Sequence, residues 1–171
     1  LQYRLLVTME ADAARRVLAG LLPDDLTALL AALPDNARHR LLGLLPASQV
    51  RSALKQLGYP EESAGRLMNT RFVSVRGHWT LAQALEHLRR RGETGDTINT
   101  LYVTDPQRHL IGTVGLKRLI LARQDRRVRD LVNGELVTVD AADDREHAAR
   151  MIQKYDITAL PVVDREGVLL G

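Results

Sequence analysis

The stretch RLMNTRFVSV (66–75) returns later in the chain as DLVNGELVTV (130–139), at an offset of 64 residues. Four aligned pairs have identical residues: Leu67 with Leu131, Asn69 with Asn133, Val73 with Val137, and Val75 with Val139. Short runs in which a serine or threonine lies between two valines favour β-strands. The duplication therefore predicts two equivalent structural units, each beginning with a short strand, at 72–75 and at 136–139.

The two copies continue in the same order. LYVTD (101–105) matches LPVVD (160–164) at an offset of 59, and LIG (110–112) matches LLG (169–171). Between these strands, apolar residues at helical spacing predict one amphipathic helix in each copy. The first copy ends with a further helix after TVG (113–115). The second copy stops at Gly171, so we expect the natural protein to continue beyond it.

The residues ahead of the duplication are organised differently. Three Leu-Pro steps, at 22–23, 33–34 and 45–46, divide them into short leucine-rich segments. Proline is tolerated in the first turn of a helix but ends a helix that precedes it. Residues 1–58 are therefore predicted to form a stack of short helices. YPEESAGRLMN (59–69) joins the stack to the first copy, and we expect Pro60 to begin a short helix there that Asn69 ends.

Composition excludes several function classes. The chain has 171 residues and a formal net charge of +3, which is too small to indicate nucleic-acid binding. It has no cysteine, which excludes disulfides and thiolate metal sites and fits a cytoplasmic location. Its longest uncharged run is ten residues, Leu41–Val50, against about twenty for a spanning helix. The five histidines are scattered, and no catalytic motif occurs, so we do not expect an enzyme.

The duplicated unit resembles a tandem cystathionine-β-synthase (CBS) domain pair. The helical stack, joined through YPEESAGRLM (59–68), is similar to the cytosolic part of MgtE-type magnesium transporters. The resemblance implies an α + α/β fold: an all-α superhelical stack of short helices followed by a tandem CBS-domain pair of β-α-β-β-α repeats. The expected domains are a helical domain, a junction, a first CBS unit and a truncated second unit, at 1–58, 59–71, 72–129 and 130–171.

The resemblance also implies a function. MgtE-type cytosolic regions sense Mg²⁺ and gate ion transport, because bound Mg²⁺ closes the helical domain on the CBS pair. The expected partners are a second copy, bound through the CBS units, and a membrane-spanning domain of the same chain. The full-length protein would lie at the cytoplasmic face of the inner membrane, and the present chain would be soluble. We expect an apolar helix face to form the dimer contact: Leu81, Leu85 and Leu88, or Leu116 and Ile120.

Three carboxylates occupy positions that resemble the family's Mg²⁺ ligands: Asp24, Glu146 and Asp156. The backbone carbonyl near Gln153 is a further candidate. The chain departs from the family pattern at Ala28, where a second acid is expected, and at Arg66, where a glycine is expected. From the residues alone, Asp24 is also a normal first-turn acid of a helix, and Asp156 a normal residue of an exposed turn.

An alternative is an adenine-nucleotide-responsive CBS module attached to another effector protein. CBS pairs commonly hold the ribose with a hydroxyl residue followed by an aspartate, but Gly115 and Arg118 stand at those positions here. A nucleotide therefore remains a possible partner rather than an expected cofactor. A third interpretation is an interaction scaffold in which the helical stack binds another protein.

Overall fold

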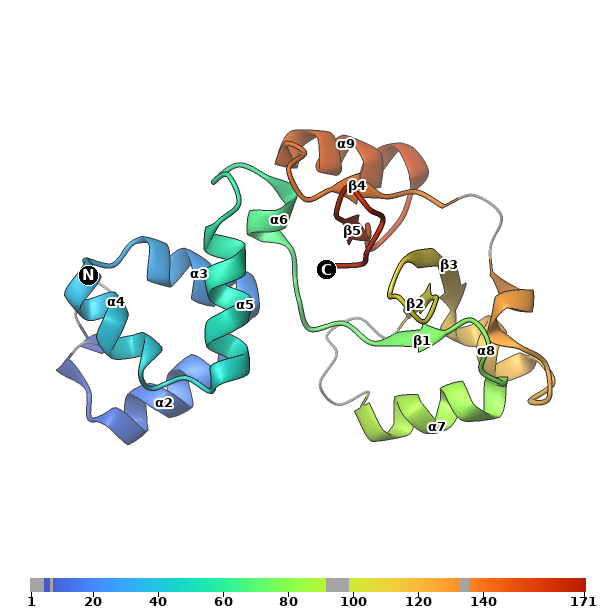
Figure 1. The fold of residues 1–171 in the computed structure, drawn as a ribbon, viewed down its shortest axis with the longest axis horizontal. Coiled ribbons are helices and arrows are strands. Elements are labelled where there is room, and N and C mark those ends of the chain that lie inside the picture. Colours follow the sequence, from blue (N-terminus) through green and yellow to red (C-terminus); the bar gives the residue numbers. More distant parts are fainter. Residues whose placement is uncertain (1–4, 7, 92–98, 133–135) are drawn as a thin grey trace.

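The computed structural model describes residues 5–6, 8–91, 99–132 and 136–171; Asn133, which aligns with Asn69, lies outside them. A stack of helices occupies one side of the molecule and two small α/β units the other (Figure 1). The predicted fold class is therefore confirmed.

The stack contains α2 (Ala11–Gly20), α3 (Pro23–Ala31), α4 (Asp35–Leu42) and α5 (Ala47–Leu57). Each of the last three begins at a proline or directly after one, as the Leu-Pro steps predict. Leucines from all four helices and their connections form one core, including Leu18, Leu26, Leu30, Leu33, Leu41 and Leu45. Each helix is too short to be stable alone, so this shared core holds the stack together.

The first unit contains β1 (Ser74–Arg76), α7 (Leu81–Arg91), β2 (Thr100–Thr104), β3 (Leu110–Gly115) and α8 (Leu116–Leu121). β1 runs parallel to β2, and β2 runs antiparallel to β3. The second unit contains β4 (Val139–Asp140), α9 (Arg145–Tyr155) and β5 (Val162–Val163), with β4 and β5 parallel.

The register of the two sheets confirms the duplication. Val75 pairs with Val103 in the first unit, and their equivalents, Val139 and Val162, pair in the second. The first strands begin two and three residues later than predicted, because the hydrogen-bonded pairing with β2 and β5 starts only there. The sequence pattern thus located both strands but not their beginnings.

The two units meet through their hairpins in a symmetric contact. The Leu110 N–H donates to the Gly167 carbonyl at 3.0 Å, and the Leu169 N–H donates to the Arg108 carbonyl at 3.1 Å. These four residues form two equivalent pairs at the 59-residue offset. Arg108 and Gly167 both have positive φ, 76° and 81°, so the same turn is built once with arginine and once with glycine. A local twofold axis therefore relates the units here.

The segments that lead into the two units are exchanged. α6 (Ala64–Leu67) precedes the first unit but docks on the second, where the Gly65 N–H donates to the Ala141 carbonyl at 2.8 Å. The 3₁₀ helix η2 (Val128–Leu131) precedes the second unit but docks on the first, where the Arg129 N–H donates to the Gly77 carbonyl at 3.0 Å. Each unit therefore completes its core with a segment that leads into the other.

Two expectations need correction. The short junction helix begins at Ala64 with Ser63 as its N-cap, not at Pro60, because the Ser63 Oγ accepts the Arg66 N–H. Leu81 and Leu88 do not form an exposed face, since both are buried in the core of the first unit. The exposed apolar residues of this unit include Ile120 and Leu121 on α8, which are 57% and 75% exposed.

We expect Gly65→Ala to weaken the docking of α6. A Cβ at Gly65 would lie 2.8 Å from the Ala141 carbonyl oxygen and 2.8 Å from the Tyr59 ring, so the backbone must shift. Such overpacking lowers the free energy of unfolding by about 1–3 kcal/mol. Gly20→Ala is the control, because nothing lies within 4 Å of its added Cβ. Equal stability of the two variants in urea unfolding would contradict the prediction.

Candidate functional site

The helical stack is attached to the junction by buried polar contacts. Gln56, on α5, is only 1% exposed. Its Nε2 donates to the Met68 carbonyl at 2.8 Å, and its Oε1 accepts the Thr27 hydroxyl at 3.2 Å. Because a buried amide left without partners is costly, these bonds fix α5 against the chain that leaves α6. Figure 1 shows α6 between α5 and β4, so the second unit supports the stack through α6.

The junction also contacts α9. Glu62 Oε2 lies 2.5 Å from the Arg145 Nε, and the Glu62 carbonyl accepts the Arg145 N–H at 2.8 Å. Glu62 of the junction thus pairs with Arg145 of the second unit through both its side chain and its backbone. This pair places the beginning of α9 beside the junction.

Asp24 lies in the first turn of α3, directly after Pro23. Its Oδ1 is buried and accepts no hydrogen bond from the described residues. A carboxylate oxygen shielded from water without a donor is an unusual arrangement, because burying unpaired charge is unfavourable. A cation bound at this oxygen would remove the penalty. Ala28, one turn later, adds no carboxylate.

Glu146 lies in the first turn of α9 behind the N-cap Asp144, whose Oδ1 accepts the Glu146 N–H at 2.7 Å. The Glu146 side chain is 77% exposed, and its Oε2 lies 3.8 Å from the Arg150 Nη1. The positive end of the helix dipole favours a carboxylate at this position without any metal. This environment therefore makes Glu146 the weaker ligand candidate on α9.

Asp156 caps the other end of α9 in a left-handed conformation, with φ 50° and ψ 46°. Its side chain is exposed, and the Gln153 carbonyl is among the last carbonyls of the helix, which lack intrahelical donors. The negative end of the helix dipole favours a cation here. Asp156 with the Gln153 carbonyl is therefore a suitable partial ligand set for Mg²⁺, which needs only one or two carboxylates and retains several waters.

Glu146 and Asp156 cannot share one ion. They are ten positions apart at opposite ends of α9, which corresponds to about 15 Å at the helical rise. In the part of the chain that the structure describes, no three histidine or acidic side chains converge where they could hold a metal. The structure thus places the three predicted ligands without uniting them, and their role in metal binding stays a prediction.

A cleft of about 340 Å³ lies between the two units. Asp156, Thr158 and Pro161 line it from the second unit, and Thr100 and Gly115 line it from the first. Sequence analysis placed Gly115 here by resemblance but missed the threonines that line the cleft, Thr100, Thr113 and Thr158, because nothing in their local pattern distinguishes them from surface residues.

Electrostatics identify two further acids at the junction. Burial raises the pKa of the Tyr59 hydroxyl, and the carboxylates of Asp164 and Asp140 raise it further. Both acids lie at the carboxyl ends of the parallel strands β4 and β5.

Elsewhere, desolvation tends to raise the pKa of Asp105, but hydrogen bonds from the side chain and backbone of His109 outweigh it and lower that pKa.

None of the helices among the described residues has the length and apolar character that a membrane span requires.

Comparison with known proteins supplies the family. Residues 1–62 match the MgtE intracellular N domain, and residues 64–125 and 128–171 match the CBS domain. A solved structure described as the cytosolic domain of the Mg²⁺ channel MgtE in complex with ATP is 33% identical, with a TM-score of 0.87. The match covers 99% of this chain and 74% of that one. The chain belongs to the MgtE family.

Other MgtE relatives agree. The soluble part of a magnesium transporter superposes with a TM-score of 0.92 at 32% identity, over 99% of this chain and 66% of that one. The magnesium transporter MgtE of Bacillus subtilis (strain 168) is 34% identical over 148 residues, which are 86% of this chain. The match covers 33% of that relative, so the chain spans one third of its length.

Arg66 stands where the resemblance led us to expect a glycine. Its guanidinium turns toward α5, where Nη1 donates to the Leu57 carbonyl at 2.8 Å. Cations at the end of a helix stabilise its unpaired carbonyls. Arg66 thus contributes to the attachment of the stack in this chain.

Proposed function

We propose that this chain is the Mg²⁺-sensing regulatory region of a MgtE-type transporter, placed on the cytoplasmic face of the membrane. In this proposal Mg²⁺ favours closure of the helical stack on the CBS pair and thereby controls ion transport. The observation that carries the proposal is the buried Asp24 Oδ1, which has no hydrogen-bond donor among the described residues. Asp156, at the cation-favouring end of α9, supports it from the second unit.

The physical basis is a shift between two arrangements. An ion moves a conformational equilibrium only as far as its affinity differs between the two states. Without Mg²⁺, neighbouring carboxylates repel by about 1 kcal/mol per pair in water and by more where solvent is excluded. Bound Mg²⁺ reverses this repulsion. The docking of α6 on β4 provides a fixed base against which the stack can close.

We expect Mg²⁺ to reduce the radius of gyration of the chain in small-angle X-ray scattering at constant ionic strength. Asp24→Asn and Asp156→Asn should each raise the Mg²⁺ concentration at half-transition by at least about fivefold. Asp125→Asn makes the same charge change at an exposed acid that pairs with Arg123, and should leave the midpoint unchanged. A transition that is identical in all four proteins would exclude Asp24 and Asp156 as ligands.

A homodimer through the CBS units is part of the proposal. Ile120 and Leu121 form an exposed apolar surface on α8, and burying such side chains stabilises an interface by about 1.5–3 kcal/mol each. Of the two helix faces expected from the sequence, we therefore propose the one on α8 as the dimer surface, because Leu81 and Leu88 of α7 are buried.

We expect Ile120→Ser combined with Leu121→Ser to raise the dimer dissociation constant at least about tenfold in sedimentation equilibrium. Leu54→Ser is the matched control, because Leu54 is 50% exposed but lies on α5 of the stack. Dissociation caused equally by both substitutions would place the interface elsewhere.

Adenine-nucleotide binding is a second candidate function. The cleft between the units has a volume of about 340 Å³, within the range typical of ligand sites, and the structurally similar MgtE cytosolic domain is described in complex with ATP. In this chain Thr100, Thr113 and Thr158 supply hydroxyl groups, while Gly115 and Arg118 replace the usual ribose-binding pair.

We expect ATP to bind in this cleft, and Gly115→Leu to abolish binding without unfolding the chain. Nothing lies within 4 Å of a Cβ added at Gly115, so the new side chain meets no clash at its base and occupies cleft space. Calorimetric titration with ATP measures the effect, and Gly20→Ala, at another open glycine, is the control. If Gly115→Leu bound ATP with undiminished affinity, the nucleotide would have to bind outside this cleft.

A further inference from the structure

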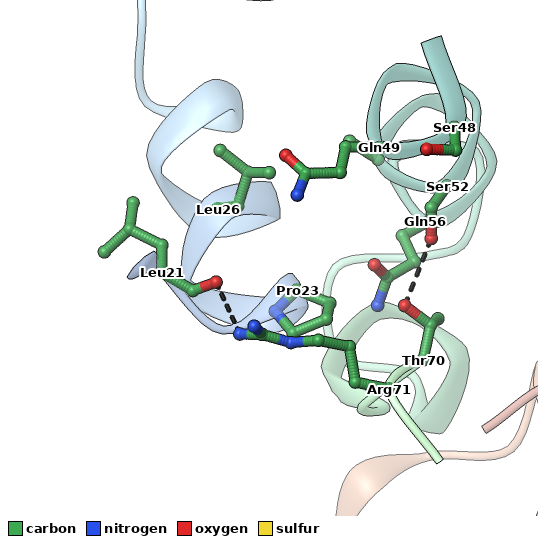
Figure 2. A pocket seen from close by; sticks show the side chains of 10 residues that line it. Leu21, Pro23, Leu26, Ser48, Gln49, Ser52, Gln56, Thr70 and Arg71 are labelled. Carbon is green, nitrogen blue, oxygen red and sulfur yellow. Dashed lines mark hydrogen bonds between the residues drawn. The ribbon is translucent and has the colours of Figure 1, made fainter. Parts of the chain in front are cut away.

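A separate cavity of about 270 Å³ lies between α3, α5 and the segment that leads from α6 to β1 (Figure 2). Leu21, Pro23 and Leu26 form its apolar side. Its polar side has hydroxyl and amide groups and one guanidinium, from Ser48, Gln49, Ser52, Thr70 and Arg71. It shares no residue with the cleft between the units, and none of the three candidate Mg²⁺ ligands lines it.

Gln49 leaves an acceptor unused in this cavity. Its side chain extends from α5 toward α3, beside Leu26 (Figure 2). Its Oε1 is buried and accepts no hydrogen bond from the described residues. Burying such an oxygen forfeits its bond to water, so a partner that donates an N–H or O–H would be favourable. A ligand group that satisfies this oxygen must therefore be a hydrogen-bond donor.

Arg71 provides the charge. Its Nη2 donates to the Leu21 carbonyl at 2.6 Å, which holds the guanidinium at the cavity beside Pro23 (Figure 2). A guanidinium has five N–H donors in a planar fork that matches a carboxylate. The other nine lining residues are uncharged, so the cavity has a net positive charge and favours an anion over a cation.

We propose that this cavity binds a small organic carboxylate with an apolar body and one hydroxyl or amine donor. The carboxylate pairs with Arg71, the donor satisfies the Gln49 Oε1, and the body lies against Leu26 and Pro23. The volume is just below the range of about 300–1,000 Å³ for drug-sized ligands, so the ligand is a smaller molecule.

Such a ligand would link the stack to the CBS pair. Gln49 and Leu26 belong to the stack, whereas Arg71 and Thr70 belong to the segment that leads from α6 to β1 in the first unit. The Ser52 and Thr70 hydroxyls already meet across this boundary at 3.1 Å. A molecule that contacts both sides strengthens their attachment and gives the sensor a second chemical input, independent of Mg²⁺.

The test uses three probes on the full ¹⁵N-labelled chain, in EDTA so that no Mg²⁺ is bound. The probe 4-hydroxybenzoate has the carboxylate and the donor, benzoate lacks the donor, and phenol lacks the carboxylate. We expect 4-hydroxybenzoate to cause saturable amide shifts at Ser48, Ser52 and Thr70, with a dissociation constant on the order of 1 mM. Benzoate and phenol should each bind at least about fivefold more weakly.

Variants assign the two polar contacts. Gln49→Leu should remove the advantage of 4-hydroxybenzoate over benzoate, and it disrupts no side-chain hydrogen bond within the described residues. Arg71→Gln should weaken the binding of 4-hydroxybenzoate at least about fivefold but leave the affinity for phenol unchanged. Arg51→Gln removes an exposed positive charge from α5, outside the cavity, and should change the affinity for neither 4-hydroxybenzoate nor phenol.

Three results would overturn the proposal: no saturable shift with 4-hydroxybenzoate, equal affinity for 4-hydroxybenzoate and phenol in the wild-type chain, or shifts confined to the cleft residues Thr100 and Thr158. None of these results bears on Mg²⁺-driven compaction, which is measured without the probes.

Discussion

The exchange of lead-in segments between the two CBS units is the constraint on which the other contacts depend. Each exchanged segment donates backbone N–H groups to the chain that follows the first strand of the opposite unit, at Ala141 and at Gly77. Residues on these segments also fill the opposite cores: Val128 and Leu131 in the first unit, and Ala64 in the second. Neither unit has a complete core without the other's leading segment.

This exchange decides where the helical stack is attached. The stack precedes the first unit in sequence, yet it rests on α6, and α6 rests on the second unit (Figure 1). Two side chains bind α5 to the α6 segment: Gln56 of α5 donates to the Met68 carbonyl, and Arg66 of α6 donates to the carbonyl at the end of α5. The position of the stack is therefore coupled to the unit that is more distant in sequence, which also contains α9 and the candidate ligand Asp156, as well as to the segment that enters the first unit.

Much of this architecture follows from the sequence. The Leu-Pro steps located the helices of the stack, and the two offsets located equivalent strands, because both patterns arise from side chains that must be buried or must end a helix. The exchange left little trace, since it uses backbone N–H and carbonyl groups that every residue has. Apolar periodicity also could not tell whether Leu81 covers its own sheet or a partner molecule. The resemblance located the candidate acids, but the opposite helix-dipole environments of Glu146 and Asp156 required the structure.

The order of synthesis gives the exchange a final consequence. Helices of the stack contact one another locally, so the stack can fold as soon as it leaves the ribosome. The first unit must wait for Val128 and Leu131, which emerge after all of its own strands and helices. The junction must wait longer still, because the β4–β5 sheet on which α6 docks is complete only after Val163. During synthesis the stack can therefore be folded while the junction that follows it is still undocked, until almost all of the described sequence has been made.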